Sequence, residues 1–301
     1  MAVRPDCPFS NMRILVTGAG GLLAYALKEA APKGVELVML RHAEFDLTKP
    51  EQMQEQMRAH RPDVVINTAA YNFVDRCEVE RELSWAVNAT GPQKLAELCA
   101  ANGCKLVHYG SDYVFDGSKG APYVEDDPPN PVNHYAAGKL AGEQGVLAFS
   151  PRNLVLRVSW LFGWHPTQTK TYVHTVLSQA RKGQDVKATT DQSSAPTYVP
   201  DLARWTFELI RRNATGRWHA VNDEGLSRLE WTKAILTEAE ALGLPKVSVE
   251  PVTTAYFNPT IRRPTFTVLS NAKLARLLER PPGSWRAGLR EMLKKMKNEQ
   301  E

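Results

Sequence analysis

The chain has 301 residues, 43% of them hydrophobic and 23% charged, a composition that indicates a globular protein and excludes the disordered, collagen-like and membrane-spanning classes. Lys and Arg outnumber Asp and Glu by 37 to 33, and the resulting charge of +4 is too small to indicate a nucleic-acid partner. The length predicts two structural units at about 150 residues per domain, and four scattered cysteines favour the reducing cytoplasm over a disulfide framework or a zinc site.

Strands and helices are predicted to alternate through the first half of the chain. Apolar runs typical of buried strands occur at 13–17, 35–40, 63–67, 105–109 and 154–160, and helical patterns lie between them at 22–31, 50–60, 84–102 and 135–149. Because such alternation produces parallel βαβ units, we expect an α/β fold with a Rossmann-type doubly wound parallel sheet over residues 12–160. Residues 1–11 are expected to be a disordered extension.

The alternation weakens after residue 160. Helices are predicted at 171–182, 198–212, 228–242, 271–278 and 284–297, and most of the 20 prolines lie in the segments between them or in the loop 121–131. We therefore expect a smaller lobe over residues 161–301 that is partly interleaved with the first unit. The part from about 198 to 222 is expected to return to the Rossmann-type unit.

A glycine-rich turn, TGAGGLLA at 17–24, follows the first predicted strand and opens the first helix. Gly18 permits the tight turn, and Gly20 and Gly21 let the backbone approach a pyrophosphate, which the helix N-terminus then faces. A glycine cluster alone is weak evidence, and a plain turn is the alternative, but the strand and helix around it favour a dinucleotide site. The candidate cofactor contacts in this turn are Gly18, Gly20, Gly21, Leu22 and Leu23.

Arg41 follows the second predicted strand, where a nicotinamide cofactor's adenosine ribose is recognised. NAD usually requires a carboxylate at this position, whereas the 2′-phosphate of NADP requires a guanidinium. The tip Leu40-Arg41-His42 has no carboxylate, which favours NADPH; NADH and a plain surface arginine are the alternatives. Further candidate cofactor contacts are Asp46 and Leu47 beside the adenine, and Thr68, Ala69 and Ala70 at the end of the third strand.

Tyr135 and Lys139 lie four residues apart in a predicted helix and so share one face of it. A neighbouring ammonium lowers the pKa of a phenol from about 10, which makes the phenol a usable proton donor to a carbonyl. About half a Tyr-x-x-x-Lys match is expected by chance in this chain, so the surrounding motifs must decide. Ser111 lies at the end of the strand predicted at 105–109, where its hydroxyl could polarise the same carbonyl.

These pieces, in this order and spacing, resemble the extended short-chain dehydrogenase/reductases. Further segments narrow the resemblance to the dTDP-4-dehydrorhamnose reductases, from about residue 12 to the C-terminal helix; they are 67–71, 74–75, Glu78, 87–89, 111–117, 131–135, 157–160, 191–197 and 262–264. The family often has Gly directly after the tyrosine and Ser or Thr before the lysine, where this chain has Ala136 and Gly138. Neither position transfers a proton, so these departures affect the prediction of which substrate is bound and not the prediction of the proton-transfer chemistry.

The resemblance implies that Ser111, Tyr135 and Lys139 form a catalytic triad, with Tyr135 and Lys139 also holding the cofactor. The implied reaction is the NADPH-dependent reduction of the C4 ketone of a nucleotide sugar, dTDP-4-dehydrorhamnose, to dTDP-L-rhamnose in carbohydrate biosynthesis. Some relatives dimerise and some involve Mg²⁺, so a homodimer and Mg²⁺ are admitted, but no residue is assigned to a metal. The implied substrate contacts are Asp112, Tyr113, Trp160, Gln192, Thr197, Arg262 and Arg263.

Some of the implied substrate contacts could instead have an ordinary structural role. Trp160 at a strand end could be packing, and Arg262-Arg263 could be a solvated pair rather than a clamp on a diphosphate. Two other functions remain open on the same fold: a different 4-ketosugar reductase or an epimerase, and a non-catalytic regulatory subunit like the β subunit of methionine adenosyltransferase. Arg41 weighs against an epimerase that retains NAD, and the complete triad favours catalysis.

Overall fold

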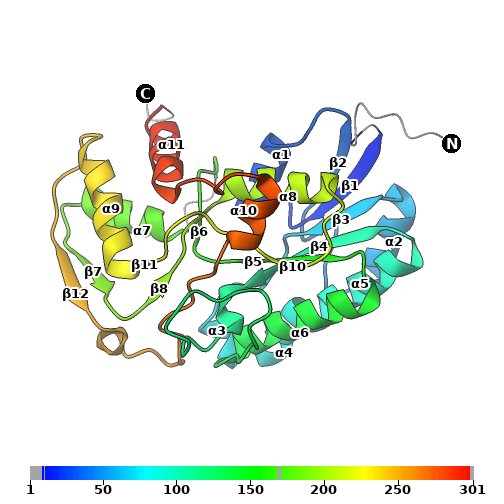
Figure 1. Cartoon of the computed structure of the whole chain (residues 1–301), viewed down its shortest axis with the longest axis horizontal. Helices are drawn as coiled ribbons and strands as arrows, with labels where there is room; N and C mark the ends of the chain where they lie inside the picture. The colour runs from blue at the N-terminus through cyan, green and yellow to red at the C-terminus, as the bar shows by residue number, and fades with distance from the viewer. Residues whose placement is uncertain (1–8, 10, 168–170, 299–301) are drawn as a thin grey trace. The chain divides into compact units, whose positions relative to one another are not determined.

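A computed structural model describes residues 9, 11–167 and 171–298 and divides the chain into two compact units (Figure 1). Unit 1 comprises Met1–Ser111, Asn133–Arg157 and Ala203–Trp218, and unit 2 comprises Asp112–Val132, Val158–Leu202 and His219–Glu301. Of the predicted disordered extension, residues 1–8 and 10 lie outside the described residues. Phe9 is buried, with its ring 6.3 Å from that of Phe207.

Unit 1 is built on a six-stranded sheet with the order β10-β5-β4-β3-β1-β2. β1 pairs in parallel with β2 on one side and with β3 on the other, and β3 pairs in parallel with β4. The strand order therefore reverses between β1 and β3, where doubly wound sheets bind ligands, and the predicted fold class is confirmed. The strands are β1 (Met12–Thr17), β2 (Val35–Leu40), β3 (Val64–Asn67), β4 (Lys105–Ser111), β5 (Leu154–Val158) and β10 (Gly216–His219).

Helices cover both faces of this sheet (Figure 1). On one face lie α1 (Leu22–Glu29) and the later part of α8 (Val199–Arg211); on the other lie α2 (Pro50–His60), α5 (Gly91–Ala101) and α6 (His134–Phe149). The core on the second face contains side chains that are fully or almost fully buried, including Leu15, Met53, Met57, Val65, Leu95 and Leu106. These continuous apolar strands match the prediction of a sheet that is buried on both faces.

The helix predicted over 84–102 is interrupted in the structure. α3 (Arg76–Val79) and α4 (Arg81–Trp85) lead into a π-helical turn, η1 (Ala86–Thr90), and only then does α5 begin. The Asn88 side chain in this turn accepts a hydrogen bond from the Tyr71 N–H (2.9 Å) and donates one to the Tyr71 carbonyl (3.0 Å). The wider turn thus orients Asn88 toward the loop after β3, a use of π-turns that is common near functional sites.

Among its described residues, unit 2 contains four complete helices, the start of α8 and short strand pairs. α7 (Tyr172–Arg181), α9 (Arg228–Glu240) and α11 (Trp285–Asn298) share an apolar cluster that includes Leu177, Trp231, Ile235, Trp285 and Leu289. The fourth helix is α10 (Ala272–Leu278), and two 3-10 turns are η2 (Asp112–Val114) and η3 (Thr254–Phe257). The pairs are β6 (Leu161–Phe162) with β9 (Thr197–Tyr198), β7 (Val186–Thr189) with β12 (Val249–Val252), and β8 (Ser193–Ser194) with β11 (Leu226–Ser227).

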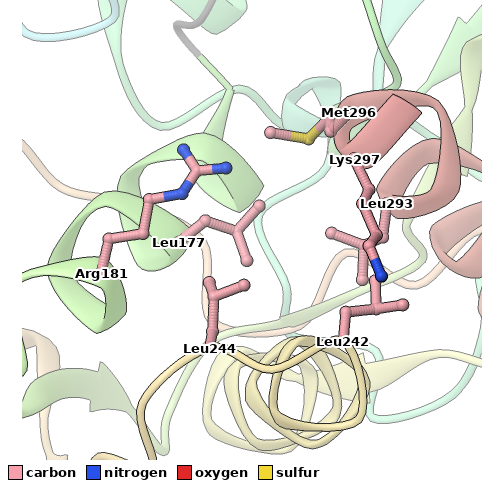
Figure 2. A pocket seen from close by; sticks show the side chains of 7 residues that line it. All are labelled: Leu177, Arg181, Leu242, Leu244, Leu293, Met296 and Lys297. Atoms are coloured by element: carbon pink, nitrogen blue, oxygen red, sulfur yellow. The ribbon is translucent and has the colours of Figure 1, made fainter. Parts of the chain in front are cut away.

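An apolar cavity of about 260 Å³ opens between α7, α11 and the segment that follows α9. Figure 2 shows leucine side chains from these three segments converging on it, with Arg181 on α7 and Lys297 on α11 beside them. It is lined by Leu177, Arg181, Leu242, Leu244, Leu293, Met296 and Lys297, and none of the predicted site residues is among them. Among the described helices, none has the length and apolar character needed to cross a membrane.

Candidate active site

The glycine-rich turn after β1 is tied to the ends of β2 and β3. Gly18 has a φ of +69°, and a Cβ there would lie 2.9 Å from Thr68 Oγ1 and 3.0 Å from the Ala69 nitrogen. The Thr68 hydroxyl donates to the Thr17 carbonyl (2.6 Å), and the Ala19 N–H donates to the Leu40 carbonyl (3.0 Å). The close approach and the left-handed backbone both require glycine at position 18.

The N-terminus of α1 leaves room for an anion. Its N-cap is Gly21, and within the described part of the chain no side chain caps the helix. A Cβ at Gly20 would meet no other atom within 4 Å, so this side of the turn faces open space. Leu22 is half-buried and the Leu23 side chain is buried. Their first-turn N–H groups, rather than their side chains, are therefore the groups that could contact a bound anion. Amides and a helix dipole that face open space fit a pyrophosphate.

The residues predicted at the adenosine end fall into two groups. Arg41 is exposed directly after β2, and its backbone N–H donates to Glu44 Oε2 (2.9 Å). Asp46 is buried, which acts to raise its pKa, but hydrogen bonds from the Thr48 N–H and hydroxyl together with the charges of His42 and Lys49 lower it. Leu47 packs in the core of unit 1. The side chains of Asp46 and Leu47 are thus committed to the fold of the loop, which leaves their main chain for contact with a cofactor.

A buried polar chain connects the ends of β1, β3 and β4. Asn67 Oδ1 accepts from the Thr17 hydroxyl (2.7 Å) and from the Ala69 N–H (3.1 Å), and Asn67 Nδ2 lies 3.1 Å from His108 Nδ1. Burial and the nearby Lys139 charge hold the pKa of His108 well below its usual value, so the imidazole is neutral. This chain holds the segment containing Thr68, Ala69 and Ala70, which is half-buried after β3.

The three predicted catalytic residues come from β4 and α6, which pack against each other in unit 1. β4 ends at Ser111, which is buried. The Asn133 side chain caps α6 by accepting from the Ala136 N–H (2.9 Å), and this fixes Tyr135 in the first turn. Lys139 lies one turn further along the same face and is 3% exposed.

Lys139 is held as a buried cation. Its Nζ donates to the Tyr109 carbonyl (2.7 Å). Burial lowers the pKa of Lys139 to about 8, while the charge of Glu143 acts in the opposite direction. The ammonium form therefore predominates at neutral pH, but only narrowly compared with an exposed lysine. A cation in this position favours release of the proton from a neighbouring phenol.

In unit 2, Arg228 gathers several of the predicted substrate residues around it. Its guanidinium carbon lies 3.5 Å from the centre of the Trp160 ring and 4.4 Å from that of Tyr172. Trp160 also stacks on Trp231, with the ring centres 5.2 Å apart. Burial lowers the pKa of Arg228 to about 10, so it remains charged at neutral pH.

Tyr113 and Arg263 belong to the same cluster. Burial raises the pKa of the Tyr113 phenol, and a hydrogen bond with Arg263 opposes that effect. The Arg263 charge also acts on Arg228. Two guanidinium groups and a phenol beside an indole ring could bind an anionic ligand that also carries an apolar face.

The remaining predicted substrate residues occupy supporting or separate places in unit 2. Asp112 is buried and accepts from the hydroxyls of Ser194 (2.9 Å) and Thr267 (2.5 Å). The carbonyl of Gln192 accepts from the Arg228 N–H (2.8 Å). Thr197 is fully buried, with its hydroxyl 3.5 Å from the Ala195 carbonyl, and Arg262 is exposed. The structure therefore gathers Tyr113, Trp160 and Arg263, but it places Thr197 in the interior.

Sequence reasoning missed Arg228, and the reason is local. Ser227 and Glu230 form a capping box at the start of α9, so Arg228 has the pattern of a first-turn surface residue. Only its stacking on Trp160, 68 positions away in the chain, reveals a further role. The sequence indicates this role only through the spacing of Arg228 and Trp231, which lie three residues apart and so on one face of α9.

No metal site is apparent in the described ranges. Groups of three or more His, Cys, Asp or Glu side chains that could hold an ion are absent from residues 9, 11–167 and 171–298. Mg²⁺ therefore has no ligand set among these residues.

Comparison with known proteins decides the family. The model of the RmlD substrate binding domain matches residues 12–298. The chain is a member of the RmlD substrate binding domain family. A dTDP-4-dehydrorhamnose reductase of Mycobacterium tuberculosis is 37% identical to this RmlD-family chain over 283 residues, which cover 92% of the chain and 91% of the relative.

Solved structures agree with this membership. A dTDP-4-dehydrorhamnose reductase from Bacillus anthracis in complex with NADP matches the RmlD-family chain with a TM-score of 0.88 and 31% identity, covering 95% of the chain and 99% of that structure. One from Clostridium acetobutylicum gives a TM-score of 0.89 at 30% identity, covering 95% of the chain and all of that structure. The sequence resemblance to extended short-chain reductases is thereby confirmed.

Proposed function

We propose that this protein is an NADPH-dependent reductase that converts the C4 ketone of dTDP-4-dehydrorhamnose into the alcohol of dTDP-L-rhamnose. The observation that carries the proposal is the placement of Ser111, Tyr135 and Lys139 on adjoining β4 and α6, with Lys139 buried and charged. Relatives that bear this reductase name match nearly the whole chain. Fold and family support the reaction class, and the residues supply its chemistry.

The residues that would hold NADPH lie along the switch point of the sheet. The first-turn N–H groups of Leu22 and Leu23 would bind the pyrophosphate, for which Gly20 leaves space. Arg41 would bind the 2′-phosphate, and Tyr135 and Lys139 the nicotinamide ribose. When bound, NADPH supplies the hydride for the substrate carbonyl. The B. anthracis relative in complex with NADP supports this choice of cofactor.

The chain's own residues supply the proton and the electrostatics. The Ser111 hydroxyl donates a hydrogen bond to the carbonyl oxygen as negative charge develops on it. The Tyr135 phenol gives its proton to that oxygen, which completes the alcohol and leaves a phenolate. The Lys139 ammonium, held by the Tyr109 carbonyl, stabilises the phenolate, and neutral His108 adds no competing cation.

The Arg228 cluster supports a nucleotide-sugar substrate. Arg228 and Arg263 would bind the diphosphate, and Trp160 would present an apolar face to the sugar or the base. Asp112 and Gln192 would support this cluster indirectly. Asp112 accepts hydrogen bonds from Ser194 and Thr267, and the Gln192 carbonyl accepts one from the Arg228 backbone. The Arg262 side chain is exposed and contributes charge from the surface.

The direct test mixes the purified protein with NADPH and dTDP-4-dehydrorhamnose and follows cofactor oxidation. We expect one equivalent of NADPH to be consumed per equivalent of keto-sugar, and no consumption without it. Tightly held NAD with no net cofactor consumption would instead indicate an epimerase. Absence of turnover on any ketosugar, with a stoichiometric protein partner, would indicate a regulatory subunit.

Replacing Arg41 with Ala should weaken NADPH binding about 10- to 100-fold, because a charge-assisted contact with the 2′-phosphate is lost. NADH binding should stay within about twofold, since NADH carries no such phosphate. Titration calorimetry with both cofactors measures the two effects. Arg58→Ala, at an exposed arginine on α2, is the control and should change neither affinity. Equal losses for NADPH and NADH in the Arg41 variant would exclude the assigned contact.

Replacing Gly20 with Val should weaken NADPH binding about tenfold or more while leaving the melting temperature unchanged, because the side chain enters open space needed by the pyrophosphate. Gly18→Ala is the informative comparison. Its left-handed backbone and its contact with Thr68 predict a loss of both stability and binding. Wild-type NADPH affinity in the Gly20 variant would show that this turn does not hold the pyrophosphate.

A further inference from the structure

A fully buried carboxylate lies one turn beyond Lys139 on α6. Tyr135, Lys139 and Glu143 are spaced by four residues and so share one face of the helix. The Glu143 side chain is 0% exposed, although glutamate is almost never fully buried without a partner. The catalytic mechanism above does not use it.

Two arginines from the sheet hold this carboxylate. Arg157 on β5, also 0% exposed, donates its Nε to Glu143 Oε2 (2.9 Å) and its Nη2 to Oε1 (2.7 Å), a bidentate pair. Arg217 on β10 donates its Nε to the same Oε1 (2.5 Å), and its side chain is 30% exposed. Glu143 is thereby fixed in position from two strands.

The fold makes space for this arrangement. A Cβ at Gly110 would lie 3.1 Å from Arg157 Cγ and 3.2 Å from Glu143 Oε2, closer than a side chain normally tolerates. Gly110 stands between Tyr109, whose carbonyl accepts from Lys139, and Ser111. The ion pair and the candidate catalytic residues therefore meet at one stretch of β4.

The charges around Lys139 come from four elements. α6 contributes Tyr135 and Glu143, β4 contributes neutral His108, and β5 and β10 contribute Arg157 and Arg217 through their bonds to Glu143. Arg157 and Arg217 thus bond to the one carboxylate whose charge also acts on Lys139. Burial lowers the pKa of Lys139, and Glu143 is the group that opposes this effect.

We propose that Glu143 is a positioning residue for the reductase reaction: held by Arg157 and Arg217, its carboxylate keeps the buried Lys139 ammonium charged and in place one helical turn beyond Tyr135. The inference rests on the proposed function for its catalytic meaning. The two arginines have opposing effects. They fix the carboxylate in position, but their positive charges also partly offset its effect on the pKa of Lys139. Removing Arg217 should therefore strengthen the action of Glu143 on Lys139, and removing the Glu143 charge should abolish it.

The test measures the ionisation of Lys139 in Glu143→Gln and Arg217→Gln. The cofactor-free protein is labelled at lysine ¹³Cε, the Lys139 signal is assigned with Lys139→Arg, and its shift is followed by NMR against pH. We expect the midpoint to fall by about one pH unit in Glu143→Gln and to rise in Arg217→Gln. The alkaline limb of kcat/KM against pH should move in the same two directions. Arg217→Gln removes a partly exposed group and tests the proposal even where Glu143→Gln does not fold.

Glu125→Gln is the matched control. Glu125 is a buried carboxylate in unit 2 that accepts from the His219 N–H (3.0 Å), and its replacement should leave the Lys139 midpoint unchanged. A merely structural role for Glu143 predicts no opposite shifts, so midpoints that move in one direction or not at all would overturn the proposal. The NMR titration needs no substrate, so opposite shifts without ketosugar turnover would reject the proposed function while leaving the Glu143–Lys139 coupling in place.

Discussion

Replacing Tyr135 with Phe is expected to lower kcat about 10²- to 10⁴-fold, because the substrate oxygen loses its proton donor. Tyr135 stands in the capped first turn of α6, one turn before the buried Lys139, and the substitution removes only the hydroxyl. NADPH affinity should fall by much less, because the pyrophosphate and 2′-phosphate contacts remain. Single-turnover kinetics together with a cofactor titration separate the two quantities.

Tyr256→Phe provides the matched control for this variant. Tyr256 is 54% exposed in unit 2, where it contacts Lys187, and its hydroxyl has no place in the proposed chemistry. Its replacement should leave kcat unchanged. If Tyr135→Phe turned over at the rate of the parent protein, the role assigned to Tyr135 would be wrong and another proton donor would have to be sought.

Replacing Gly142 with Ala is expected to lower the free energy of unfolding by about 1–3 kcal/mol, because the added methyl overpacks a tight helix contact. A Cβ at Gly142 would lie 2.2 Å from the Asn88 carbonyl oxygen, so either α6 or the π-helical turn η1 must move. A shift of η1 would also disturb the bonds from Asn88 to Tyr71. Urea unfolding monitored by circular dichroism measures the loss.

Gly138, one turn earlier on the same helix, is the control position. A Cβ there would meet Asn88 Cβ at 3.4 Å and Trp85 Cε3 at 3.9 Å, which are ordinary contacts. Gly138→Ala should therefore be neutral or stabilise the protein by up to about 1 kcal/mol through reduced backbone entropy of the unfolded chain. Equal destabilisation at both positions would contradict the packing described for α6 and η1.

The sequence predicts those parts of the fold and of the candidate site whose function depends on a local pattern of residues. The glycine turn between β1 and α1 lies at the predicted place because Gly18 is required both by its left-handed backbone and by the approach of Thr68. The spacing of Tyr135 and Lys139 specified a shared helix face without any knowledge of the fold. The parallel order of the sheet followed from the alternation of apolar runs with amphipathic helices.

Features that depend on distant contacts could not be predicted in this way. The π-turn η1 interrupts an otherwise helical pattern because Asn88 bonds to Tyr71, 17 residues away. Arg228 has the pattern of a surface residue until Trp160 stacks on it. In the sequence, Glu143 has the pattern of a solvent-exposed helix carboxylate, whereas in the structure it is buried in an ion pair with Arg157. Strands of two to four residues in unit 2 were likewise too short for a periodic signal.

In the proposed reaction, a hydride passes from NADPH to C4 of the keto-sugar, and a proton passes from Tyr135 to its oxygen. The most direct measurement supplies NADPH deuterated at the transferable position of C4 and examines the product by mass spectrometry and NMR. We expect one deuterium in each product molecule, located at C4 of the sugar in dTDP-L-rhamnose. A product without deuterium, or with deuterium at any other carbon, would contradict it.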